Sequence, residues 1–287
     1  VDSLGDQVIE NATEGTDLVR SPIALASAFA NVENYIFNVT ANVSFTANEL
    51  NNAVNGGTGN DTLSGDSQDN FIDGGQGSNS ISGGAGNDTL TAGVGNDTFD
   101  GGAGSNVVEY FTAPGPVTVN LASGSATGAA GSDTLINIQG VGGSNFNDVL
   151  VGSAGSDVLN GHGGADTMTG GAGPYHFVYD HVTDGGTVLT NQTAAAAGAV
   201  GDTITDFQTT IDTLDFKQGP YDPSATLVII GSAYDGTNSG VGSGAAFVLD
   251  STGNLNYDAD VNTAGYTVVA NVGPSTPVAA TDIHFNP

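Results

Sequence analysis

Residues 56–109 read GGTGNDTLS GDSQDNFID GGQGSNSIS GGAGNDTLT AGVGNDTFD GGAGSNVVE, a pattern that repeats every nine residues. Each segment joins a glycine-rich polar half to a short half with one large apolar residue at its eighth position. A nine-residue apolar period fits neither an amphipathic helix nor an alternating strand, but it fits a solenoid whose backbone turns a corner in every segment. The eighth-position residues are Leu63, Ile72, Ile81, Leu90, Phe99 and Val108, and Val54 continues the series upstream.

The two halves of each segment have different roles. Glycines at positions 1, 2 and 4 allow tight or left-handed backbone conformations, and the residues that follow run extended with the eighth side chain pointing inward. One short strand cannot bury that side chain alone, so the segments must stack. If consecutive segments lie on opposite sheets, every segment lies directly on top of the next but one in the chain.

This stacking gathers the sixth-position residues into two columns. Carboxylate and amide oxygens would converge there with the carbonyls of the glycine-rich turns, and such an all-oxygen set suits a hard cation. The first column holds Asp61, Asn79 and Asp97, and the second holds Asn70, Asp88 and Asn106.

The six segments resemble the RTX, or haemolysin-type, calcium-binding nonapeptide repeat GGxGxDxUx, where U is a large apolar residue. The resemblance implies an all-β fold, a right-handed parallel β-roll stapled by several calcium ions. It also implies that each ion lies between the loops of two stacked segments, which are separated in the chain by one other segment. The first loop would supply the carbonyls of positions 2 and 4 and the sixth side chain, and the second loop the carbonyls of positions 1 and 3 and the sixth side chain.

Carried onto this chain, the resemblance predicts four sites in residues 56–109. Every pair of loops contributes one Asp and one Asn, so we expect weaker sites than Asp/Asp ones, matched to millimolar extracellular calcium. In the first column, Gly57, Gly59 and Asp61 would meet Gly74, Gln76 and Asn79, and Gly75, Gly77 and Asn79 would meet Ala92, Val94 and Asp97. In the second column, Asp66, Gln68 and Asn70 would meet Gly83, Ala85 and Asp88, and Gly84, Gly86 and Asp88 would meet Gly101, Ala103 and Asn106.

The period resumes at residues 143–178 as GSNFNDVLV GSAGSDVLN GHGGADTMT GGAGPYHFV. Here Asp148 pairs with Asp166, and we expect this fully acidic pair to form the tightest site of the chain. Asp157 faces Tyr175 where the repeat calls for Asp, which weakens the case for a site there. The carbonyls expected to assist Asp148 and Asp166 are those of Ser144, Phe146, Gly161 and Gly163.

Five regions follow from these patterns. Residues 1–55 are expected to form irregular β coils with strands at 7–10, 17–21, 32–39 and 42–46, while residues 24–30 could instead start a short helix. Residues 56–109 and 143–180 are the two repeat blocks. Residues 110–142 are expected to be metal-free coils within the roll, with strands near 117–121 and 135–138 and with Asp133 as a turn residue.

Residues 181–287 are expected to form a β-rich cap, similar to the secretion-associated module of RTX proteins. A cap is needed because an open end of the roll exposes a sheet edge and its apolar core. Strands are predicted at 227–230, 246–249, 254–257 and 266–272. Asp258, Asp260 and Asn262 alternate as at the start of a calcium loop or in a polar hairpin turn, and the sequence leaves both interpretations open.

Composition excludes several classes of partner. The chain has 31 acidic residues against Arg20 and Lys217, a formal net charge of -29, so nucleic acid and anionic membranes are implausible partners. With no cysteine, metal ions would replace disulfides as cross-links. No stretch reaches the length of a transmembrane helix. The chain starts at Val1 without a signal peptide, so we expect a piece of a larger protein that type I secretion machinery exports, as the resemblance implies.

Catalytic chemistry is not indicated. The paired carboxylates lie in glycine loops at positions fixed by the repeat, and no GxSxG elbow or phosphate loop is present. His162, His176, His181 and His284 show no zinc-ligand spacing.

We therefore expect a noncatalytic, secreted calcium-binding module that folds when calcium rises on export. It would be part of a surface layer, a filament or an adhesin, with copies of itself or other surface proteins as partners. The alternative is the C-terminal domain of a secreted enzyme, such as a serralysin-like protease or an alginate-modifying enzyme, with its catalytic domain upstream.

Overall fold

The structure is a computed structural model of the 287-residue chain. It describes residues 1–12, 15–179, 188–190, 202–204, 206–207, 212–217, 226–229, 246–249, 254–258, 265–272, 278 and 282–286. The chain divides into two compact units, Val1–Val141 and Gly142–Pro287, and each is described by itself. Both units are built from short β-strands, which confirms the all-β prediction.

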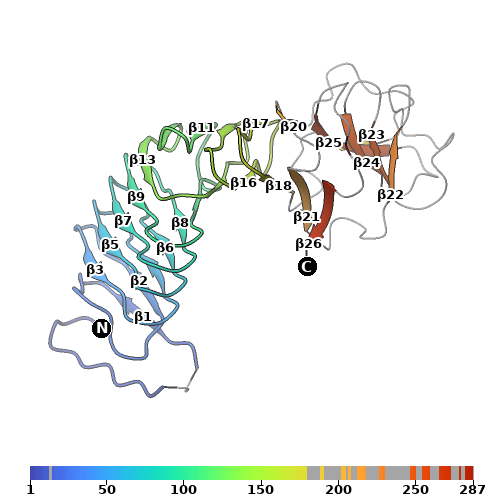
Figure 1. Cartoon of the computed structure of the whole chain (residues 1–287). Coiled ribbons are helices and arrows are strands. Elements are labelled where there is room, and N and C mark those ends of the chain that lie inside the picture. Colours follow the sequence, from blue (N-terminus) through green and yellow to red (C-terminus); the bar gives the residue numbers. More distant parts are fainter. Residues whose placement is uncertain are drawn as a thin grey trace. The chain divides into compact units, whose positions relative to one another are not determined.

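In the first unit the repeat segments form two parallel sheets that face each other across the core (Figure 1). Successive strands alternate between the sheets, so each strand pairs with the next but one in the chain. Leu63 lies beside Ile81 and Ile72 beside Leu90. One sheet contains, in order, β1 (Leu18–Ser21), β2 (Asn34–Phe37), β4 (Ala53–Asn55), β6 (Phe71–Asp73), β8 (Thr89–Thr91) and β10 (Val107–Glu109), followed by β14 (Gly140–Gly142) at the unit boundary. The other contains β3 (Ser44–Thr46), β5 (Thr62–Ser64), β7 (Ser80–Ser82) and β9 (Thr98–Asp100).

The core of this unit is a double row of eighth-position side chains. Leu63, Ile72, Ile81, Leu90, Phe99 and Val108 are all buried, and their strand neighbours mostly face outward. At the N-terminal end, Tyr35 and Phe37 pack on Phe45, with ring centroids 4.7 and 5.1 Å apart. These rings fill the end of the roll with bulkier groups than the aliphatic rows supply.

Residues 110–142 contain the strands that the sequence suggests near 117–121 and 135–138, together with a hairpin that it does not. β11 (Val117–Asn120) and β12 (Ser125–Gly128) form an antiparallel hairpin, and β13 (Ser132–Ile136) then runs antiparallel to β12. On its other side β13 pairs in parallel with β9, where the next coil of the roll would lie. The excursion therefore returns the chain to the roll in register.

Residues 1–55 partly follow the prediction. Three of the four expected strands appear as β1, β2 and β3, but residues 7–10 form no strand. Residues 24–30 form no helix. They form one isolated parallel bridge to Thr46 instead, in which Ala28 N–H donates to the Thr46 carbonyl at 2.9 Å and Thr46 N–H donates to the Ala26 carbonyl at 3.1 Å.

The second unit continues the same construction. One sheet contains β16 (Asp157–Asn160), β18 (Tyr175–Tyr179), β21 (Thr213–Lys217) and β26 (Ile283–Asn286). The other contains β15 (Val149–Val151), β17 (Thr167–Thr169) and β20 (Asp202–Ile204), followed by β25 (Gly265–Asn271), β24 (Asn254–Asp258), β23 (Ala246–Leu249) and β22 (Thr226–Ile229), with β19 (Val188–Thr190) also paired to β25.

The four strands predicted in residues 181–287 are confirmed to within a residue at most ends. β23, β24 and β25 are antiparallel to one another, unlike the parallel strands of the repeat blocks. Asp260, Asn262 and His181 lie outside the described residues. No helix in the described part of the chain has the length and apolar character needed to cross a membrane.

Candidate metal centre

The sixth-position residues form two buried ladders in the first unit. In each ladder, Oδ1 of one residue accepts a hydrogen bond from the backbone N–H of the corresponding residue in the coil before it. Asp61 N–H donates to Asn79 Oδ1 at 2.9 Å, and Asn79 N–H donates to Asp97 Oδ1 at 2.7 Å. In the second ladder the corresponding bonds run from Asn52 to Asn70, Asn70 to Asp88 and Asp88 to Asn106, at 3.0, 2.8 and 3.0 Å.

Three ladder aspartates of the first unit have a second carboxylate oxygen that accepts no hydrogen bond from the described residues. Oδ2 of Asp61, Asp88 and Asp97 is buried and has no hydrogen-bond partner among the described residues, and the same holds for Asp166 in the second unit. An isolated buried carboxylate oxygen is costly, since burial removes water without replacing its hydrogen bonds. A cation on this oxygen would remove that cost.

Predicted ligand oxygens converge over the first glycine of each loop. A Cβ built on Gly56 would lie 2.5 Å from Asp61 Oδ2 and 3.0 Å from the Gly74 carbonyl oxygen. At Gly83 the corresponding distances are 2.3 Å to Asp88 Oδ2 and 2.8 Å to the Gly101 carbonyl. The absence of a side chain at position 1 thus leaves room where a carboxylate and a carbonyl from two loops meet, as a calcium site requires. We call each such place a gap, named after the sixth residue of its first loop.

Burial raises the pKa of these carboxyls. The pKa of Asp97 rises to about 6, because burial disfavours its charge and Asp133 lies nearby. The pKa of Asp61 and of Asp88 is raised for the same first reason. In the second unit burial and the neighbouring Asp148 raise the pKa of Asp166 to about 8. Each group therefore favours a positive partner.

The asparagines of the ladders differ from the aspartates. Asn79 Nδ2 donates to the carbonyl of Gly77 in its own loop at 3.1 Å, and Asn70 Nδ2 donates to the Gln68 carbonyl at 2.7 Å and to Asp66 Oδ1 at 3.1 Å. Gly77 and Gln68 are two of the predicted ligand carbonyls.

Protein donors also serve the predicted sites of the second unit. Ser144 Oγ donates to Asp148 Oδ1 at 2.9 Å, and Ser144 N–H donates to Oδ2. Asp148 N–H in turn donates to Asp166 Oδ1 at 2.7 Å, which places the acidic pair in one ladder as predicted.

The gap of Asp157 is filled differently. Tyr175 stands beside Asp157 in the strand register, its ring lies over Gly170, and its hydroxyl donates to the Ser153 carbonyl. The Ser153 N–H donates to Asp157 Oδ2. The aromatic side chain thus occupies the side of the gap where an Asp was missing from the repeat.

Asp133 and Asp202 are ladder residues that escaped the sequence reasoning. Asp133, expected in a turn, is buried in the first ladder, where Asp97 N–H donates to its Oδ1 at 2.8 Å and the Tyr110 hydroxyl donates to its Oδ2 at 2.9 Å. Asp202 continues the second unit's ladder by accepting from Asp166 N–H at 2.9 Å. Both lie four full periods after their partners, and GSDTL (131–135) and GDTI (201–204) repeat the motif GNDTL of residues 59–63.

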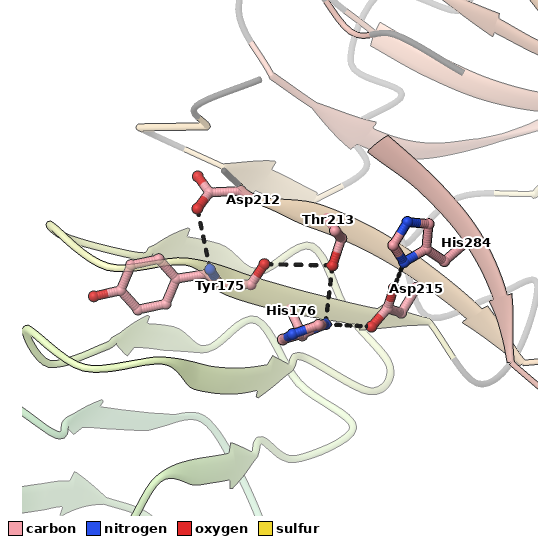
Figure 2. A network of polar contacts seen from close by, with 6 residues as sticks. All are labelled: Tyr175, His176, Asp212, Thr213, Asp215 and His284. Atoms are coloured by element: carbon pink, nitrogen blue, oxygen red, sulfur yellow. Dashed lines mark hydrogen bonds and ion pairs between the residues drawn. The ribbon is translucent and has the colours of Figure 1, made fainter. Parts of the chain in front are cut away.

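A separate polar network lies on the outer face of β18, β21 and β26 (Figure 2). Asp215 Oδ2 lies 2.7 Å from His176 Nδ1, and Asp215 Oδ1 lies 3.3 Å from His284 Nδ1. Thr213 Oγ1 lies 2.9 Å from the same His176 Nδ1. Sequence spacing could not predict that both histidines contact Asp215, because the pairing of distant strands brings them there. These contacts join β21 to β18 and to β26. Within the described residues, no group of three His, Asp, Glu or Cys side chains is arranged to hold a metal.

The roll and its ladders define a class of protein, the parallel β-rolls whose glycine-rich loops present oxygen ligands between stacked coils. Residues 46–81, 73–108 and 142–174 match the family model of the RTX calcium-binding nonapeptide repeat. The chain therefore carries RTX calcium-binding repeats and contains a calcium-binding β-roll. No curated protein matches the chain.

In such a roll the ion would be held by the aspartate Oδ2 atoms and the loop carbonyls described above. It would supply the positive charge that joins one coil to the next.

Proposed function

We propose that this chain is a noncatalytic structural module that is secreted, binds calcium outside the cell and becomes ordered as it does so. The observation that carries the proposal is the set of buried aspartate oxygens, Oδ2 of Asp61, Asp88 and Asp97, that have no hydrogen-bond partner in the described residues. Without a cation these carboxylates oppose folding, and with one they cross-link coils that bury only one large side chain each.

Export by type I machinery and a place in a surface layer, filament or adhesin agree with the repeats and with the composition. A net charge of -29 with two cationic residues makes copies of the chain repel one another. Millimolar calcium outside a cell both fills weak loop sites and neutralises acidic faces, so the same ion that orders the roll would allow copies to assemble.

A calcium titration of the full chain tests this proposal. Starting in chelator, we expect the β-sheet circular dichroism signal to rise cooperatively with calcium in the millimolar range, and magnesium at equal concentration to produce a much smaller change. Light scattering in the same titration reports assembly. A spectrum that is the same in chelator and in calcium would contradict the proposal.

A further inference from the structure

We infer that the amide of Asn79 takes the place of a cation in its own loop, so that calcium enters the Asp61 gap but not the Asn79 gap next to it in the ladder. The inference rests on the proposed calcium-binding function. It predicts that Gly75, Gly77, Asn79, Ala92, Val94 and Asp97, although placed by the repeat as one ligand set, enclose no ion.

The orientation of the Asn79 amide is fixed by its neighbours. Oδ1 must accept the N–H of Asp61, at 2.9 Å, because a reversed amide would set two donors against each other. Nδ2 is then the only group left to face the loop, and it donates to the Gly77 carbonyl at 3.1 Å. Gly77 is the position-4 carbonyl that a calcium ion would need.

The nitrogen also lies where the aspartates place an oxygen. A Cβ built on Gly74 would lie 2.7 Å from Asn79 Nδ2, just as one built on Gly56 would lie 2.5 Å from Asp61 Oδ2. Over the first glycine of the loop, the Asp61 gap thus presents a negative oxygen and the Asn79 gap presents two N–H groups. A donor in this place satisfies the carbonyl and repels a cation.

One carboxylate oxygen of the second loop of the Asn79 gap is already used by the protein. Asp97 Oδ1 is used by the N–H of Asn79, at 2.7 Å. Asp97 Oδ2 is buried and has no hydrogen-bond partner among the described residues. The Asn79 gap therefore has at most this one carboxylate oxygen, whereas an Asp at position 79 would add a second.

Conversion of the amide to a carboxylate tests the inference. We expect Asn79→Asp to bind one calcium ion more than the wild type in isothermal titration calorimetry of the full chain. Asn60→Asp is the matched control, because Asn60 is exposed at the fifth position of the neighbouring loop and its Oδ1 accepts from Ser78 N–H at 2.8 Å. It adds the same charge without changing a ladder, so its ion count should equal that of the wild type.

The reverse substitution keeps the test decisive if Asn79→Asp folds poorly. We expect Asp61→Asn to bind one ion fewer and, in chelator, to show a larger β-sheet circular dichroism signal than the wild type, since the new amide can donate to the Gly59 carbonyl. An unchanged ion count in Asn79→Asp, or a smaller β-sheet signal of Asp61→Asn in chelator, would overturn the inference. A wild type that binds no calcium would instead refute the proposed function.

Discussion

Each sixth-position residue of the repeat makes contacts in two directions. Its Oδ1 accepts from the coil before it, and its second atom faces its own loop. Asp and Asn are equal in the first contact, as the bonds of Asn79 and Asp97 show. They differ in the second contact, where Oδ2 of Asp61 is left needing a cation and the amide of Asn79 donates to a carbonyl. Oδ1 thus has a structural role, and the second terminal atom decides whether a cation can bind.

The position-2 glycines are required by backbone conformation. Gly75 has φ +76°, and a Cβ there would lie 2.0 Å from the Gly57 carbonyl oxygen. We expect Gly75→Ala to destabilise the calcium-bound protein by at least about 1–3 kcal/mol from strain alone, measured by urea unfolding.

Gly155→Ala is the matched control for this substitution. Gly155 also lies in a repeat loop, but the nearest atom to its Cβ position, Ser153 Oγ, is 3.4 Å away. Its change in unfolding free energy should be small, and equal losses in the two variants would show that backbone conformation is not the cause.

At the scale of the elements, each strand of the first repeat block is short and buries one large side chain. Leu90 on β8 is buried between Ile72 and Val108 of the neighbouring strands. We expect Leu90→Ala to cost about 2–5 kcal/mol of unfolding free energy in saturating calcium. Val94→Ala, at a side chain 49% exposed in the adjacent loop, should change it by no more than about 0.5 kcal/mol. A small loss at Leu90 would mean that the ions alone hold the coils together.

The repeat strands could be predicted because the nine-residue period specifies sheet, face and partner together. Where the period stops, prediction was less complete. The helix considered for residues 24–30 is replaced by an isolated parallel bridge to Thr46. Local composition could not reveal that partner.

Asp133 was missed for a different reason. The separation of Val108 and Leu150 in the chain is not a multiple of nine, and this hid the fact that Asp97 and Asp133 are separated by four whole periods. The ladder that contains Asp133 keeps the period, whereas the other sheet does not. The network around Asp215 could not be found at all, because its members come from strands far apart in sequence.

At the scale of the whole molecule, charge opposes folding. A net charge of -29 is repulsive at low ionic strength, and salt screens exposed charges more than buried ones. In chelator, we expect 1 M sodium chloride to raise the β-sheet circular dichroism signal only slightly, because it shortens the Debye length to about 3 Å and so weakens the repulsion between exposed charges. Millimolar calcium should raise it much further by filling the gaps. If sodium chloride alone matched calcium, screening rather than ligation would explain the stability.

The hairpin of β11 and β12 shows that the roll accepts an added segment at one coil without losing the alignment of the coils around it, since β13 still pairs with β9. The turn between Asn120 and Ser125 is therefore a natural attachment point for a foreign peptide. A peptide grafted there would be displayed at a fixed place on the roll. Removal of calcium would then disorder the roll that carries it.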